Sequence, residues 1–134
     1  MLSSQKPTED YLRNFLATQA PLKFTYAAVG ATATVPPDGY VVDRTRVKLG
    51  EGQAVFERAK AALKRWEQFN LGWVAAWPTD SPLDVGTVVA VMGRAIGLWW
   101  LNCCRIIYVI NETENIERFG FAYGTLPGHV DSGE

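Results

Sequence analysis

The amino-acid sequence predicts one domain of the α+β class, in which an antiparallel sheet carries its helices on one face. Two helical patterns lie before residue 72, and the region after it consists of β-branched and aromatic runs separated by turn residues. Helices and strands that are segregated in this way along a chain are typical of α+β folds. The chain has 134 residues, of which 48% are apolar and 20% charged, so it is long enough for one hydrophobic core but not for two.

Two segments are expected to be helical. The first follows Thr8, which is a good N-cap, and ends before Pro21. The second begins near Gly52 and carries apolar residues at helical spacing as far as Phe69. We expect Gly72 to supply the left-handed position that ends this helix. Its apolar stripe contains two large aromatic side chains and should therefore pack on a large surface.

The remaining apolar segments are expected to be extended. They are residues 31–35, 40–49, 73–77, 87–92, 98–110 and 116–126. Residues 85–110 are almost wholly apolar, but Arg94 and Arg105 interrupt them, and an arginine near the middle of a membrane-spanning helix costs several kcal/mol. Two buried strands explain this stretch better than a membrane helix does.

The last two strands are expected to form a hairpin. If Ile110 pairs with Ile116, then Arg105 lies opposite Phe121, in the middle of an aromatic face. On the other face the returning strand carries only small residues, namely Gly120, Ala122 and Gly124. Such a bare face is expected where another element packs very close.

Charge and cysteine usage limit the environment of the protein. The chain carries 13 basic and 14 acidic residues, a formal net charge of −1, which offers no electrostatic footprint for nucleic acid or for an anionic membrane. The first residues show no apolar signal-peptide core, so we expect a cytoplasmic protein. Cys103 and Cys104 are adjacent and are expected to be two buried thiols rather than a disulfide.

Residues 119–134 read FGFAYGTLPGHVDSGE and resemble the signature of an uncharacterised family of bacterial and plant proteins, catalogued as domain of unknown function nineteen-ninety. Members of that family resemble the helix-grip (START-like, Bet v 1-like) superfamily, in which a curved antiparallel sheet wraps a long C-terminal helix around an apolar cavity. The resemblance implies an incomplete helix-grip fold that lacks its last strands and that helix. Residues 1–134 are accordingly expected to be a single domain truncated at its C-terminus.

The first functional hypothesis is a binding domain for a small hydrophobic or amphipathic ligand in an apolar cavity. The expected ligand-binding residues are Arg105, Asn102, Tyr123, His129, Trp66 and Trp99. Arg105 is the most informative of them, because an unpaired guanidinium on an aromatic face carries a penalty of several kcal/mol. Its partner is either the anionic end of a ligand or, as preferred here, an internal carboxylate of Glu117, Asp84 or Glu134.

Two alternatives stay open. One is an enzyme that acts on a bound hydrophobic substrate with Tyr123, His129 or Glu134 as acid or base, although a binding role without catalysis is preferred. The other is a membrane-associated or channel component, because a plant relative of the family is associated with the chloroplast outer envelope as a channel. The oligomeric state is left open.

Two tempting motifs are set aside. Gly50-Glu51-Gly52 lacks the third glycine of a dinucleotide-binding loop, so no cofactor is expected. The single histidine, His129, lies too near Asp131 and Ser132 on one loop for a hydrolytic triad, and it has no second or third ligand for zinc. No metal and no catalytic residue are therefore assigned.

Overall fold

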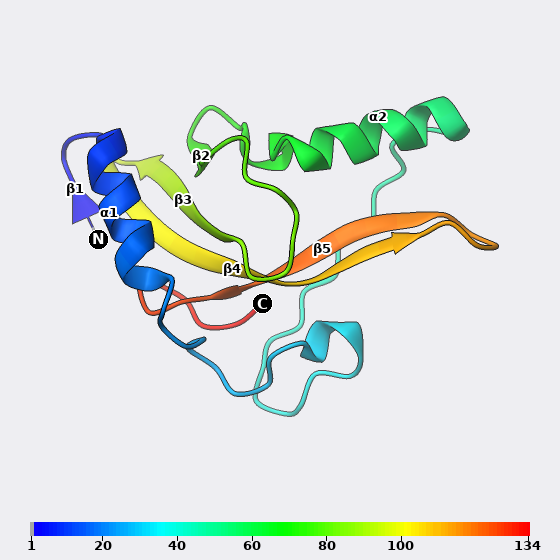
Figure 1. Ribbon diagram of the computed structural model, residues 1–134, viewed down its shortest axis with the longest axis horizontal. Coiled ribbons are helices and arrows are strands. Elements are labelled where there is room, and N and C mark those ends of the chain that lie inside the picture. Colours follow the sequence, from blue (N-terminus) through cyan, green and yellow to red (C-terminus); the bar gives the residue numbers. More distant parts are fainter. Residues whose placement is uncertain (1) are drawn as a thin grey trace.

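A curved antiparallel sheet of five strands forms the centre of the computed structural model, which describes residues 2–134 (Figure 1). The strands are β1 (Leu2–Ser3), β2 (Val74–Trp77), β3 (Val88–Ala95), β4 (Leu98–Glu112) and β5 (Arg118–Thr125). The long strand β4 pairs with β3 along one edge and with both β1 and β5 along the other, while β2 pairs with the far edge of β3. The predicted α+β class and antiparallel sheet are confirmed.

The apolar stretch 85–110 forms the two strands β3 and β4, as predicted. Its valine and isoleucine side chains suit extended backbone, and the turn between the strands falls at Ile96 and Gly97, both with positive φ. No helix in residues 2–134 is long and apolar enough to cross a membrane.

The helical elements are α1 (Glu9–Gln19), α2 (Gln53–Lys64) and the short 3-10 turns η1 (Ala31–Ala33) and η2 (Glu67–Phe69). Helix α1 begins as predicted, because the Thr8 hydroxyl accepts a hydrogen bond from the backbone N–H of Tyr11. In Figure 1, α1 and α2 lie at opposite ends of the sheet, and the segment between them passes beside β5.

The sheet is covered on both faces, where the sequence predicted helices on one face. Ala90 of β3 packs with Leu12 of α1, whereas its neighbour Val89 packs with Trp66, in the segment that follows α2. Adjacent strand residues point to opposite faces, so these are two separate clusters. The nearly unbroken apolar character of β3 and β4 is the pattern of strands buried on both sides.

Helix α2 begins where predicted, but its predicted continuation to Gly72 is wrong. It ends at Lys64, and Trp66 adopts a left-handed conformation with a φ of 58°. This turn directs the indole into the core, where Trp66 is 2% exposed and its Nε1–H donates to the carbonyl of Ser81 at 2.8 Å. Burying this large side chain outweighs the continuation of the helical ladder.

The prediction of a strand at residues 40–49 is also wrong. These residues run as an extended connection that no strand of the described chain pairs with, and Val41 is 92% exposed. Alternating apolar residues favour a strand only where a neighbouring strand offers hydrogen-bond partners. Residues 31–35 likewise contain a 3-10 turn, η1, instead of the expected extended piece.

The hairpin of β4 and β5 forms, but the predicted register is wrong. Ile110 pairs with Gly120 rather than with Ile116, because the connecting turn is longer than expected. An irregularity at Ile107, where β4 carries an extra residue, shifts the pairing once more. Arg105 therefore lies opposite Gly124 instead of opposite Phe121. It is on the face of the sheet away from Phe121 and Tyr123, which pack with Trp66.

The two thiols are buried and unpaired, as predicted. Burial raises the pKa of Cys103 to about 12, although the nearby Arg105 lowers it in part. Burial also raises the pKa of Cys104 to about 12. Both thiols are therefore protonated at neutral pH and poor nucleophiles.

Candidate functional site

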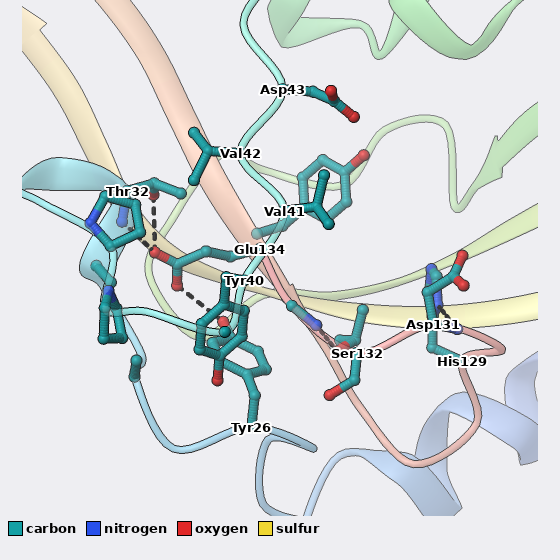
Figure 2. A pocket seen from close by; sticks show the side chains of 18 residues that line it. Tyr26, Thr32, Tyr40, Val41, Val42, Asp43, His129, Asp131, Ser132 and Glu134 are labelled. Carbon is teal, nitrogen blue, oxygen red and sulfur yellow. Dashed lines mark hydrogen bonds between the residues drawn. The ribbon is translucent and has the colours of Figure 1, made fainter.

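A pocket of about 650 Å³ lies between three segments of the chain (Figure 2). One wall consists of parts of residues 26–43, which include η1. The second is the end of β5, which contributes Tyr123 and Thr125, and the third is the loop 129–134. Two of the three walls thus belong to the motif at 119–134.

The carboxylate of Glu134 closes one side of this pocket by accepting four hydrogen bonds. Its Oε1 accepts from the backbone N–H of Thr32 at 2.6 Å and from the Thr32 hydroxyl at 2.8 Å. Its Oε2 accepts from the N–H of Gly30 at 2.7 Å. The same oxygen accepts from the Tyr26 hydroxyl at 2.8 Å (Figure 2). Gly30 has a φ of 85°, a conformation that glycine adopts without strain and that lets these N–H groups converge on one anion.

These donors hold the pKa of Glu134 below its ordinary value. Partial burial opposes the charge and raises the pKa, but the hydrogen bonds from Thr32, Gly30 and Tyr26 together outweigh it. Burial, followed by the contact with Glu134, raises the pKa of the Tyr26 hydroxyl. Because the carboxyl pKa is lowered on folding, this contact stabilises the fold above the unfolded-state pKa and is lost as the pH falls through the folded-state pKa. An ionised carboxylate with four donors suits a structural role better than an acid or base.

Thr125 ties the same segments together from the end of β5. Its N–H donates to the carbonyl of Gly133 at 2.9 Å, and its hydroxyl accepts from the N–H of Gly133 at 2.9 Å. Its carbonyl accepts from the N–H of Thr25 at 3.1 Å. Thr125 is 7% exposed, so these bonds satisfy a polar side chain that water hardly reaches.

Gly124 leaves the space that Tyr26 occupies. A Cβ atom at Gly124 would lie 2.0 Å from the Tyr26 Oη and 2.9 Å from the Ile107 Cδ1. The close approach predicted for the small residues of this strand therefore occurs at Gly124. It does not occur at Gly120, where a Cβ would meet no atom within 4 Å.

His129, Asp131 and Ser132 line the pocket but do not form a triad. The backbone N–H of Asp131 donates to the His129 Nδ1 at 2.9 Å, so this nitrogen is an acceptor and cannot donate to a carboxylate. The Ser132 hydroxyl donates to Thr25 instead. Burial lowers the pKa of His129, while Asp131 partly opposes this shift, and the imidazole is neutral at neutral pH.

The pocket contains two of the six residues that the sequence predicted for ligand binding, Tyr123 and His129. Burial raises the pKa of the Tyr123 phenol to about 12, with a further contribution from Cys104. Asn102 lies outside the pocket lining but positions the loop 129–134, because its Oδ1 accepts a hydrogen bond from the N–H of Val130 at 3.2 Å.

The other three predicted residues lie outside the pocket lining. Trp66 is in the core beneath Phe121 and Tyr123. Trp99 lies near the cationic groups of Lys6 and Arg94.

Arg105 pairs internally, as preferred, but with carbonyl groups rather than with a carboxylate. Its Nη2 donates to the carbonyls of Ala20 at 2.5 Å and Leu22 at 2.9 Å, and its guanidinium lies 5.2 Å from the centre of the Phe24 ring. The carbonyls at the end of a helix carry partial negative charge, which a cation complements. Arg105 thus holds the chain where it leaves α1.

Replacing Arg105 by methionine is expected to lower the free energy of unfolding by about 1 to 2 kcal/mol, because two charge-assisted hydrogen bonds at a partly exposed site are lost. Urea denaturation measures this change. Arg94→Met is the matched control, because Arg94 is exposed and stacks only on Trp99. Equal stability of Arg105→Met and wild type would contradict this role.

Residues 26–43 are the part of the site that sequence reasoning missed. Tyr26, Thr32 and Tyr40 lie in a segment whose pattern gave no sign of a pocket wall. The tyrosines and prolines of this segment are a compositional sign of a possible pocket wall. Composition does not reveal, however, which distant residues they contact.

Within residues 2–134, no three histidine, cysteine or acidic side chains lie close enough together to hold a metal ion. The 26–43 side of the pocket is mainly apolar and aromatic but includes Thr32 and Asp43, and the 129–134 side is mainly polar.

Comparison with known proteins identifies relatives along the whole chain. A UPF0548 protein of Dictyostelium discoideum is 29% identical over 146 aligned residues, which cover all of this chain and 68% of the relative. A UPF0548 protein of Deinococcus radiodurans is 35% identical over 146 residues, which cover all of this chain and 72% of the relative. A UPF0548 protein of Arabidopsis thaliana is 27% identical over 103 residues, 75% of this chain and 50% of the relative. No solved structure matches the chain.

The family described as Domain of unknown function (DUF1990) matches residues 25–134. The matched region contains every residue that lines the pocket, from Tyr26 to Glu134. It also contains the motif at 119–134, on which the resemblance rested. The chain therefore belongs to the DUF1990 family.

Proposed function

We propose that the protein binds a small amphipathic ligand in the pocket between residues 26–43 and 129–134. The observation that carries this proposal is the pocket itself. Its volume of about 650 Å³ lies within the range of roughly 300 to 1,000 Å³ that is typical of small-molecule sites. The ligand lies along the apolar wall and places its polar end against the loop.

The two walls differ in chemistry in the way that an amphipathic ligand requires. The segment 26–43 supplies the rings of Tyr26 and Tyr40 and the aliphatic side chains of Pro36 and Val42. The loop supplies the imidazole of His129 together with carboxylate and hydroxyl groups. Apolar contact with a few well-placed polar groups is the usual composition of a binding site.

The bonds around Glu134 and Thr125 support a preformed binding pocket. They fix the walls relative to each other, so a ligand does not have to order them on binding. The proposal includes a cytoplasmic setting.

Filling the pocket should weaken binding. Ala31→Phe places a ring at the lining, and we expect it to weaken binding of the neutral fluorescent probe N-phenyl-1-naphthylamine at least tenfold in a fluorescence titration. Ala33→Phe is the matched control, because Ala33 lies in the same short helix η1 but outside the lining, and it should bind like the wild type.

If both variants weaken probe binding equally, or if neither variant weakens it, the assignment of the probe site to this pocket is refuted. Native mass spectrometry of the protein purified from cells gives an independent result. A retained small molecule should be present in the wild type and in Ala33→Phe, and absent from Ala31→Phe.

A further inference from the structure

We propose that the pocket selects a ligand whose polar end is a positively charged amine, and that it discriminates against carboxylates and phosphates. This inference rests on the proposed function and deepens it by naming the chemical class of the ligand. It follows from the charges that the pocket lining carries and from the cations that the lining lacks.

The lining contains three carboxylates, those of Asp43, Asp131 and Glu134, and it contains no lysine or arginine. In the described part of the chain, 2–134, none of the three makes an ion pair. The four donors to Glu134 are neutral, so they stabilise its charge without cancelling it. His129 is neutral at neutral pH, because burial lowers its pKa. The lining therefore carries a net negative charge.

The three carboxylates come from two walls of the pocket, since Asp131 and Glu134 share the loop 129–134. Asp43 lies at the end of the 26–43 segment, and Asp131 lies on the opposite loop (Figure 2). Because the carboxylates are not gathered in one place, they do not form a metal site, in agreement with the absence of such a group within residues 2–134. They instead give the lining a negative charge that an organic cation complements.

The aromatic rings of the lining favour the same ligand class. Tyr26, Tyr40 and Tyr123 all contribute to the wall, and the face of a tyrosine ring attracts an organic cation that lies within about 6 Å of its centre. An anion meets no lysine or arginine in the lining, and the convergent N–H donors at Gly30 and Thr32 are already occupied by Glu134.

The test compares three eight-carbon ligands with different polar ends: octylamine, octanol and octanoate. Each is titrated at pH 7 against the protein loaded with N-phenyl-1-naphthylamine. We expect octylamine to displace the probe at a concentration about tenfold lower than octanol, and octanoate to be at least tenfold weaker than octanol. The advantage of octylamine should shrink as the salt concentration rises, because salt screens the carboxylates.

A double variant assigns the preference to particular groups. Asp43→Asn combined with Asp131→Asn should reduce the advantage of octylamine over octanol to less than threefold and leave octanol itself unchanged. Asp80→Asn is the control, because Asp80 is exposed and lies outside the pocket lining.

The outcomes separate this inference from the proposed function. If octanoate competes as well as octylamine, or if the double variant keeps the full preference, the inference is overturned, while the sensitivity of the probe to Ala31→Phe still supports binding. If probe binding is insensitive to Ala31→Phe, the proposed function itself fails and the inference fails with it.

Discussion

Replacing Trp66 by alanine is expected to lower the free energy of unfolding by about 3 to 5 kcal/mol, a large share of the roughly 5 to 15 kcal/mol that stabilises a typical domain. Trp66 is 2% exposed and packs on Val89, Cys104 and Ile106 of the sheet. Its ring centre lies 5.1 Å from that of Phe121, in an edge-to-face arrangement. Removal of the indole leaves a cavity that this surface, fixed by strand pairing, cannot fill.

Two further variants divide this effect into its parts. Trp66→Phe keeps most of the packing but loses the hydrogen bond to the Ser81 carbonyl, so we expect a loss of about 1 to 2 kcal/mol. Trp73→Ala is the control, because Trp73 is 55% exposed and its loss should cost less than about 1 kcal/mol. Urea denaturation measures the free energy of unfolding of all three variants. A Trp66→Ala variant as stable as Trp73→Ala would show that the indole does not organise this core.

Replacing Gly124 by alanine is expected to weaken ligand binding at least tenfold and to cost about 1 to 3 kcal/mol of stability. The new methyl group would lie 2.0 Å from the Tyr26 hydroxyl. The rigid ring can move away only if the hydroxyl leaves the Glu134 carboxylate. The wall formed by residues 26–43 would then lose one of its four bonds to Glu134.

The same strand provides the control for this prediction. Gly120→Ala adds a methyl group to open space and should leave binding unchanged. Tyr26→Phe removes the hydroxyl that clashes, so combining it with Gly124→Ala should cost less than the sum of the two single changes. Strict additivity in probe titrations and urea denaturation would mean that the two residues do not meet.

The local elements of the fold could be predicted where neighbouring residues determine them. Thr8 and the apolar spacing after Gly52 predicted two helix starts, and the β-branched stretch before Ile110 predicted β3 and β4. The register of the last hairpin could not be predicted in this way. It depends on the length of the connecting turn and on an extra residue at Ile107, and the residue pattern of a strand reveals neither.

The candidate site could likewise be predicted only in part. The motif at 119–134 directed attention to Tyr123 and His129, which line the pocket. The opposite wall could not be predicted, because Thr32 and Glu134 meet across about a hundred residues of chain. No local periodicity encodes such a contact. Residues 40–49 showed the reverse error, since their alternation suggested a strand for which the sheet provides no partner.

The two hydrophobic clusters of the sheet are joined through the backbone of its central strands. On β3, Val89 belongs to one cluster and its neighbour Ala90 to the other. On β4, Cys104 belongs to the cluster of Val89, and Leu101 belongs to the cluster of Ala90. Neither layer can melt without distorting strands that the other layer needs. The domain should therefore lose its structure in one cooperative step, with equal calorimetric and van't Hoff enthalpies, even though its helices lie on opposite sides of the sheet.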